Sequence, residues 1–231
     1  KIVAVLEDFF ASQTRLEKKK IVITAGPTYE KIDPVRFIGN YSSGKMGFAL
    51  AEACAERGAE VTLVAGPVSL KTHHPAIKRI DVESAGEMYQ AAMTAFPSSD
   101  AAILCAAVAD YLPENASEQK IKRETEGEMT LHLVPNPDIA ASLGAIKREG
   151  QVMVGFALET NDEATHAEGK LKRKNLDFIV LNSLRDQGAG FRCDTNKITI
   201  IDNAGGVTSY PLKTKREVAC DIVNKLVTLL K

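Results

Sequence analysis

The sequence lacks the spacing that metal-binding or disulfide-linked cysteines usually show. Its four cysteines, Cys54, Cys105, Cys193 and Cys220, lie far apart and form no C-x-x-C pair. This argues against a structural zinc site and a disulfide framework, and a reducing cytoplasm fits best. The sequence also has no apolar run of about 18 residues and no signal-peptide pattern, which predicts a protein without a membrane segment.

An excess of charge of either sign is also missing, since 29 Lys and Arg residues stand against 30 Asp and Glu residues. No net field therefore draws the protein to nucleic acid or to an anionic membrane, and any anion site has to be local. A chain of 231 residues can bury one substantial core, which favours a single domain.

Apolar strand patterns alternate with helical patterns from Lys20 onward. The continuous apolar run at residues 101–109 is typical of a central strand that is covered on both faces. Residues 198–202 and 207–210 flank Asn203-Ala-Gly-Gly206, which predicts a hairpin. The expected fold is therefore α/β: a Rossmann-like, doubly wound, mostly parallel sheet with an appended antiparallel hairpin. The other strands are expected at residues 20–26, 60–66, 77–82, 130–134, 152–157 and 177–181.

Helix starts carry recognisable signals in this sequence. Capping-box patterns begin at Ser84, Thr160 and Thr214, and Asn136 precedes a proline that would occupy the first helical position. The charged stretch at residues 113–129 has no periodicity and is interpreted as a mobile loop. Residues 1–19 have helical spacing and then turn polar, as in a helix or linker.

The stretch at residues 23–58 has the order strand, long polar loop, helix, which often presents backbone N–H groups to a phosphate. Residues 39–45 satisfy the first seven positions of the P-loop pattern, but Met46 stands where Ser or Thr is required. Gly44 and Gly47 give only G-x-x-G, so the dinucleotide fingerprint is incomplete. Gly44, Gly47 and Ala51 would also let the helix pack closely against the sheet.

Several polar residues in these loops are candidates for a site. Asn40 lies in a loop at the carboxyl end of a strand, where open α/β sheets bind ligands, and Arg36 has a planar fork suited to phosphate or carboxylate. Each of them alone is better explained as an ordinary surface residue, but together with Ser42, Ser43 and Lys45 they favour an anion-facing loop.

Further candidates follow the presumed central strand. Ala106 and Ala107 would let a ligand approach the backbone, and Asp110 is suited to a ribose hydroxyl, a base or a metal; a tight core strand with a capping Asp is the alternative. Lys120 lies in the charged loop and would suit a polyphosphate if the loop closes, although such clusters are usually only solvated. Lys170 and Lys174 lie one helical turn apart, on an ordinary exposed helix or on one that faces phosphates.

The motifs DPVRFIGNYSSGKMG, CAAVADY, KIKR, NPDI, GFALET and KLKRKNLD occur in this order. From about Lys20 to the end, the sequence with these motifs resembles the bacterial phosphopantothenoylcysteine synthetase family, often the C-terminal half of a bifunctional coenzyme A biosynthesis protein. The resemblance implies that residues 1–19 are a linker or helix from an absent upstream flavin-dependent decarboxylase, and that residues 20–231 are the synthetase domain.

The reaction implied by the resemblance condenses 4′-phosphopantothenate with cysteine. It consumes CTP through an acyl-cytidylate and releases CMP and pyrophosphate, with Mg²⁺ bridging the phosphates on protein ligands that the sequence does not identify. A carboxylate is a poor electrophile, so its activation brings two anions together and requires cations, whereas the amide-forming step requires stabilisation of an oxyanion. The choice of CTP over ATP rests on the resemblance alone.

The resemblance also implies roles for individual residues. Lys120 would neutralise triphosphate charge, and Asn40 with Arg36 would hold and convert the acyl-cytidylate, which Ala106 and Ala107 would line. Arg123 departs from the family's K-x-K-K motif but keeps the charge. The remaining expected nucleotide contacts are Asp110, Asn136, Pro137, Asp138, Ile139, Phe156, Lys170 and Lys174.

The family is dimeric, which makes the hairpin at residues 198–210 a candidate partner-facing element. Two other functions remain open from the residues themselves. A nicotinamide-dependent oxidoreductase would use a similar sheet, and Glu60 near the second strand is compatible with it. A non-catalytic nucleotide-binding module would explain the loop glycines but not Asn40 and two separate lysine clusters.

Overall fold

The computed structural model describes residues 15–122, 128–159, 163–183 and 193–230. Eight strands form one sheet in the order β13-β12-β10-β9-β6-β1-β4-β5. The six strands from β5 to β10 run parallel, whereas β12 pairs antiparallel with β10 and β13 antiparallel with β12. The strand bounds are β1 Lys20–Ala25, β4 Glu60–Ala65, β5 Ile77–Asp81, β6 Ala101–Leu104, β9 Val152–Glu159, β10 Phe178–Ser183, β12 Ile198–Asp202 and β13 Val207–Ser209. The expected fold class and appended hairpin are confirmed.

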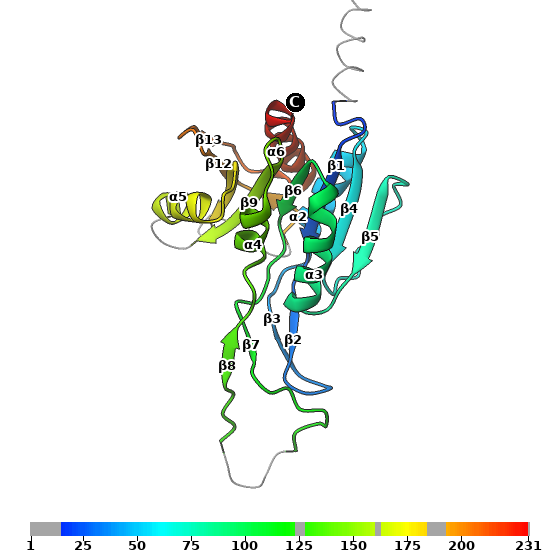
Figure 1. Ribbon diagram of the computed structural model, residues 1–231, viewed down its shortest axis with the longest axis vertical. Helices are drawn as coiled ribbons and strands as arrows, with labels where there is room; N and C mark the ends of the chain where they lie inside the picture. The colour runs from blue at the N-terminus through cyan, green and yellow to red at the C-terminus, as the bar shows by residue number, and fades with distance from the viewer. Residues whose placement is uncertain (1–14, 123–127, 160–162, 184–192, 231) are drawn as a thin grey trace, which may run out of the picture.

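Helices cover both faces of the sheet (Figure 1). Alternate residues of β1 point to opposite faces, so Ile21 and Ile23 join one core cluster and Val22 joins the other. The first cluster includes residues of α2 (Lys45–Ala55) and α6 (Lys215–Leu229), and the second includes residues of α3 (Ala85–Ala95), α4 (Ile139–Ile146) and α5 (Glu163–Arg173). The sheet is therefore doubly wound.

Local signals explain where most of these helices begin. Ser84 and Thr214 form the expected capping boxes at α3 and α6. Gly44 precedes α2 with φ of 77°, a left-handed conformation that favours glycine. A Cβ on Gly47 would lie 2.5 Å from the Cβ of Ala25, so this glycine allows the close packing of α2 on β1. The capping box expected at Thr160 lies outside the described residues.

The order of the strands reverses between β1 and β6. From β1 the chain goes to β4 and β5 on one side, then returns to β6 on the other side of β1 and continues to β9 and β10. Open α/β sheets bind ligands outside the carboxyl ends of the strands at such a reversal. The central strand β6 is shorter than predicted, so residues 105–109 are already part of this edge.

Two short hairpins extend from the same edge of the sheet as an arm (Figure 1). One pairs β2 (Tyr29–Lys31) with β3 (Phe37–Gly39), and the other pairs β7 (Tyr111–Pro113) with β8 (Leu133–Pro135). Strand β2 contacts β7. The sequence predicted a polar loop where β2 and β3 lie, and this prediction was wrong; the strand expected at 130–134 begins only at Leu133.

The part of the N-terminal segment that the structure describes joins the core, because Leu16 is fully buried beside β1 and α2 residues. The helix or linker expected at residues 1–19 lies mostly outside the described residues, and the domain boundary at residue 20 stays a prediction. No helix within the described ranges has the length and apolar character needed to cross a membrane.

Candidate functional site

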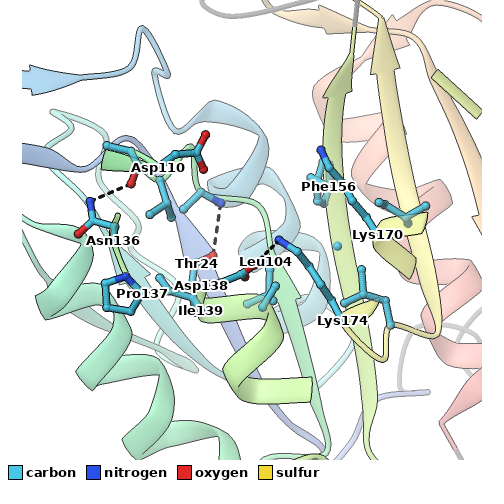
Figure 2. A pocket seen from close by; sticks show the side chains of 17 residues that line it. Thr24, Leu104, Asp110, Asn136, Pro137, Asp138, Ile139, Phe156, Lys170 and Lys174 are labelled. Atoms are coloured by element: carbon cyan, nitrogen blue, oxygen red, sulfur yellow. Dashed lines mark hydrogen bonds and ion pairs between the residues drawn. The ribbon is translucent and has the colours of Figure 1, made fainter. Parts of the chain in front are cut away.

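A cavity of about 350 Å³ opens at the carboxyl ends of β1 and β6 and beside the middle of β9, next to the strand-order reversal (Figure 2). Thr24 and Leu104 supply the ends of β1 and β6, and Gly155 and Phe156 belong to β9. Nine of the residues expected to contact a nucleotide line this one cavity: Ala106, Asp110, Asn136, Pro137, Asp138, Ile139, Phe156, Lys170 and Lys174.

The loop before α4 is held by hydrogen bonds to the segment that follows β6. The side-chain amide of Asn136 donates to the carbonyl oxygen of Ala109 over 2.9 Å, and its backbone N–H donates to the carbonyl of Asp110 over 2.8 Å. The N–H of Ala109 in turn donates to Oγ1 of the fully buried Thr28 over 3.0 Å. The expectation that Asn136 caps α4 was wrong, because Asp138 is the cap.

Asp138 links the start of α4 to the lysines of α5. Its Oδ1 accepts the N–H of Ala141 over 3.0 Å, and its Oδ2 lies 3.0 Å from Nζ of Lys174. Burial disfavours the charged carboxylate, but these N–H and ammonium groups outweigh it and hold the pKa of Asp138 below its usual value. Lys170 and Lys174 reach into the cavity from the same side (Figure 2).

Two glycines that the sequence analysis did not single out shape this cavity. A Cβ on Gly155 would lie 2.5 Å from Cδ1 of Leu176, and a Cβ on Gly144 would lie 2.2 Å from the carbonyl oxygen of Lys174. The side chain of Asn175 donates to the carbonyl of Gly144 over 3.0 Å. The close approach of α4 to the end of α5 therefore sets where Lys174 stands.

A second cavity of about 220 Å³ adjoins the first, and Ala106, Val108 and Phe156 line both. The stretch before α2 forms one of its walls, with Ser42, Ser43, Gly44 and Lys45, and Ala107 belongs to its lining. The remaining polar lining residues, which the sequence analysis missed, are Asn182, Asn196 and Lys215.

Lys215 is a buried cation in the wall of this second cavity, with 9% of its surface exposed. Its ammonium group donates to the carbonyl oxygen of Cys193. Burial lowers the pKa of Lys215, and the nearby Lys45 acts in the same direction. Lys45 itself lies 2.6 Å from Oδ1 of Asp194. Burial also raises the pKa of Cys105 to about 12, so this thiol is inert near neutral pH.

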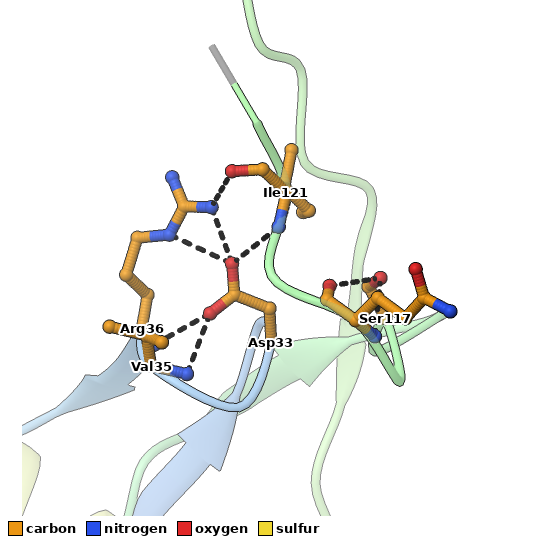
Figure 3. A network of polar contacts seen from close by, with 6 residues as sticks. Asp33, Val35, Arg36, Ser117 and Ile121 are labelled. Carbon is orange, nitrogen blue, oxygen red and sulfur yellow. Dashed lines mark hydrogen bonds and ion pairs between the residues drawn. The ribbon is translucent and has the colours of Figure 1, made fainter.

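Asn40 lies beside the second cavity, because its side-chain amide donates to the carbonyl oxygen of Ala107 over 2.9 Å. Arg36 instead forms an ion pair with the buried Asp33 and donates to the carbonyl of Ile121 over 2.7 Å (Figure 3). Lys120 is exposed, directly precedes Ile121 and lines neither cavity. The structure thus brings the nine cavity residues together but places Arg36 and Lys120 on the arm.

A resident metal has few ligands to use here. Within the described parts of the chain, no group of three or more His, Cys, Asp or Glu side chains has the arrangement of a metal site. The carboxylates in the larger cavity are Asp110 and Asp138, and Asp138 is committed to Ala141 and Lys174. A magnesium ion that entered with a polyphosphate would obtain most of its oxygen ligands from that polyphosphate.

A doubly wound sheet with two adjoining, lysine-bearing cavities at its carboxyl edge is typical of the α/β proteins that bind anionic ligands there. Residues 16–230 match the model of the DNA/pantothenate metabolism flavoprotein C-terminal domain. The chain therefore belongs to this family.

Similar proteins agree with this assignment. The chain is 47% identical over 230 residues to the Coenzyme A biosynthesis bifunctional protein CoaBC of Vibrio parahaemolyticus. This match covers 99% of the chain and 57% of that protein. It is 56% identical over 233 residues to a Cysteine/Cysteine sulfinic acid decarboxylase of an unknown prokaryotic organism, covering 99% of this chain and 65% of that protein. The chain thus spans less than two thirds of these relatives.

A solved structure resembles the chain over nearly its full length. The crystal structure of the C-terminal domain of Coenzyme A biosynthesis bifunctional protein CoaBC superposes with a TM-score of 0.80 at 40% identity. The match covers 94% of this chain and 98% of that one.

Proposed function

We propose that this chain is a phosphopantothenate–cysteine ligase of coenzyme A biosynthesis. It joins 4′-phosphopantothenate to L-cysteine with CTP through an acyl-cytidylate, and it releases CMP and pyrophosphate. The main support for the proposal is one cavity at the strand-order reversal. Nine of the residues expected to contact a nucleotide line it, and they come from four separate stretches of the sequence. The 40% identity to a domain of a coenzyme A biosynthesis protein supports it.

The larger cavity would hold the nucleotide. The ammonium groups of Lys170 and Lys174 and the backbone N–H groups at the start of α4 would face the phosphates, which is how helix starts and lysines bind such anions. Asp110 would accept hydrogen bonds from the ribose or base, and Phe156 would pack beside it. Magnesium supplies charge neutralisation when it enters with the triphosphate.

The smaller cavity would hold the acyl end of the intermediate. Ala106, Val108 and Phe156 line both cavities. A mixed anhydride bound where the two cavities meet would therefore extend into each of them. A carboxylate oxygen of phosphopantothenate attacks the α-phosphorus of CTP, and pyrophosphate leaves. The cysteine amine then attacks the acyl carbon, CMP leaves, and the amine loses a proton. Asn40 with Arg36 would hold the acyl-cytidylate and orient its acyl group in the second step, and Lys120 would offset negative charge in the first.

We also propose that the protein acts as a homodimer. Nine large apolar side chains are exposed among the described residues, and five of them lie on the arm: Val35, Phe37, Tyr111, Met129 and Leu133. The hairpin of β12 and β13 contributes only Val207 to this set, which favours the arm as the larger contact. Sedimentation of Phe37→Ser and Val207→Ser variants compares the two surfaces, and a monomeric wild type at micromolar concentration would refute the dimer.

The decarboxylase named among the relatives is a second function to test. We propose that flavin-dependent decarboxylation belongs to the part of such relatives that this chain does not cover, upstream of a linker at residues 1–19, and that the ligase acts in the cytoplasm. Release of CO₂ from cysteine or cysteine sulfinate by this chain would contradict that division.

The ligase is tested by incubating the chain with phosphopantothenate, cysteine, CTP and Mg²⁺. We expect phosphopantothenoylcysteine by mass spectrometry, with CMP and pyrophosphate formed in equal amounts. Thermal-shift titrations with CTP and NAD(P) separate the ligase from an oxidoreductase. A folded protein that binds CTP but forms no pyrophosphate would exclude the ligase and indicate a non-catalytic nucleotide-binding module.

A further inference from the structure

The carboxylate of Asp33 is the centre of a network that joins two distant parts of the arm (Figure 3). Its side chain is fully buried. Oδ1 accepts the backbone N–H groups of Val35 and Arg36, each over 2.8 Å. Oδ2 accepts three hydrogen bonds: from Nε of Arg36 over 2.9 Å, from Nη2 of the same guanidinium, and from the backbone N–H of Ile121 over 3.1 Å.

The bond to Ile121 crosses 88 positions of sequence and is reinforced from both sides. Nη2 of Arg36 donates to the carbonyl oxygen of Ile121 over 2.7 Å, so both backbone polar groups of Ile121 are bound. Four residues earlier, the N–H of Ser117 donates to the carbonyl of Ile32 over 2.9 Å. The segment from Ser117 to Ile121 is therefore attached at both of its ends to the turn that carries Asp33.

Lys120 lies within this attached segment, and its side chain is exposed and has no ion pair among the described residues. Its backbone position is thus set by its neighbours, while its side chain is exposed. The Arg36 guanidinium beside Asp33 holds the pKa of that carboxyl well below its usual range, so the network is ionised throughout the pH range of an assay.

We propose that Asp33 is a positioning residue of the ligase, which acts by fixing the backbone of Lys120 in the geometry that the cytidylylation step requires. This inference rests on the proposed function. A bland alternative is that Asp33 only caps the turn at residues 33–36 through its bonds to Val35 and Arg36.

Three substitutions separate the two explanations. Asp33→Asn keeps the shape but loses the charge that holds the guanidinium. Asp33→Ser keeps a hydroxyl that can accept the N–H groups of the turn, but it is too short to reach the guanidinium and Ile121 as well. Asp81→Asn is the matched control, since Asp81 pairs with Arg79 on the edge strand β5 and its side chain is 71% exposed.

The first measurement is pyrophosphate formation from CTP and phosphopantothenate without cysteine. We expect Asp33→Asn and Asp33→Ser each to lower its rate on the order of 10- to 100-fold, because a small displacement of a catalytic group has that effect. Asp81→Asn should match the wild type. The double variant Asp33→Asn/Lys120→Gln should be no slower than Lys120→Gln alone, because both changes remove the same contribution, that of the Lys120 ammonium group to cytidylylation.

The second measurement does not depend on activity. The amide of Ile121 should exchange with solvent faster in both Asp33 variants than in the wild type and in Asp81→Asn. Full activity of Asp33→Ser would show that Asp33 only caps the turn, and multiplicative losses in the double variant would show that it acts apart from Lys120; either result overturns the inference. A wild type that forms no pyrophosphate refutes the proposed function instead, whatever the exchange of Ile121.

Discussion

The side-chain amide of Asn40 donates a hydrogen bond to the carbonyl oxygen of Ala107, with 2.9 Å between the nitrogen and the oxygen. This contact joins two segments that are 67 positions apart and places Asn40 beside the smaller cavity, which Ala107 lines. Because the amide nitrogen is used, the amide oxygen is the atom of Asn40 that remains to accept a hydrogen bond from a ligand.

Replacing Asn40 by Asp should impair the second half of the reaction. A carboxylate cannot donate to Ala107 and would instead repel its carbonyl, which displaces the side chain from the acyl group. We expect cysteine-dependent consumption of the acyl-cytidylate to slow by about 10²-fold, a typical effect of losing one positioned polar group. Quench-flow with labelled CTP should show the intermediate accumulating.

Lys120→Gln gives the complementary result, since loss of the cation should prevent the intermediate from forming. No intermediate in Asn40→Asp together with full turnover in Lys120→Gln would show that these roles are wrongly assigned.

Replacing Lys174 by Met should weaken the binding of CTP. The change removes a cation from the larger cavity and leaves Asp138 without its partner at 3.0 Å. We expect KM for CTP to rise about tenfold, equivalent to about 1.4 kcal/mol, with a smaller effect on KM for cysteine. Lys172→Met is the control on the same helix, because Lys172 is exposed and does not line the cavity. Equal effects of the two substitutions would contradict the assignment.

Replacing Gly47 by Ala should destabilise the fold. The new Cβ would lie 2.5 Å from the Cβ of Ala25, so α2 has to move away from β1 at a cost of about 1–3 kcal/mol. Gly169→Ala is the matched control in another helix, since its Cβ meets no atom within 4 Å, and alanine there should stabilise by about 0.5–1 kcal/mol. Urea unfolding of both variants measures the difference, and a neutral Gly47→Ala would refute the close packing.

Replacing Lys215 by Met should separate stability from activity. Burial lowers the pKa of Lys215, so the charged lysine destabilises the folded state at neutral pH; this cost shrinks as the pH rises above the folded-state pKa and is gone above the unfolded-state pKa of about 10.4. We expect a higher Tm at pH 7 and a higher KM for phosphopantothenate, whose anion loses a cation beside the smaller cavity.

Lys213→Met is the control for this change, because the partner Asp221 raises the pKa of Lys213 and its charge stabilises the fold. Its Tm should fall slightly. A lower Tm for Lys215→Met, or an unchanged KM, would contradict the account of the second cavity.

Acid should remove the contribution of Asp33 to stability. The Arg36 guanidinium lowers the folded-state pKa of Asp33, so its stabilisation is fully present above the unfolded-state pKa of about 3.9 and is lost as the pH falls further. The difference in unfolding free energy between the wild type and Asp33→Asn should therefore be constant from pH 8 to pH 5 and shrink below about pH 4. Urea unfolding at pH 7, 5 and 3 tests this, and a difference that is unchanged at pH 3 would show that the charge of Asp33 contributes nothing.

The centre of the sheet could be predicted from the sequence because strands β1, β4, β6, β9 and β10 are apolar runs with clear boundaries, and the capping boxes at Ser84 and Thr214 mark helix starts locally. The arm could not. Strands β2 and β3 have three residues each, too few to show a period, and they are held by tertiary contacts such as the stacking of Tyr29 on Phe37 with centroids 3.8 Å apart.

Motifs in the sequence predicted the residues that line the larger cavity. They did not predict the buried contacts that charged side chains make elsewhere in the protein. Arg36 had the features of an exposed anion-binding fork, and only the fold shows that the turn buries Asp33 beside it. Lys215 occurs inside a capping box, where a lysine is ordinarily exposed, and its burial against Cys193 depends on a segment more than 20 residues away. Such pairings depend on chain topology rather than on local pattern.

Pyrophosphate release without cysteine shows whether this chain activates the phosphopantothenate carboxylate with CTP. With phosphopantothenate and CTP, we expect up to one equivalent of pyrophosphate per active site and continued release once cysteine is added. ATP in place of CTP should give much less. Pyrophosphate released without phosphopantothenate, or none at all from folded protein that binds CTP, would show that the chain does not activate this carboxylate with CTP.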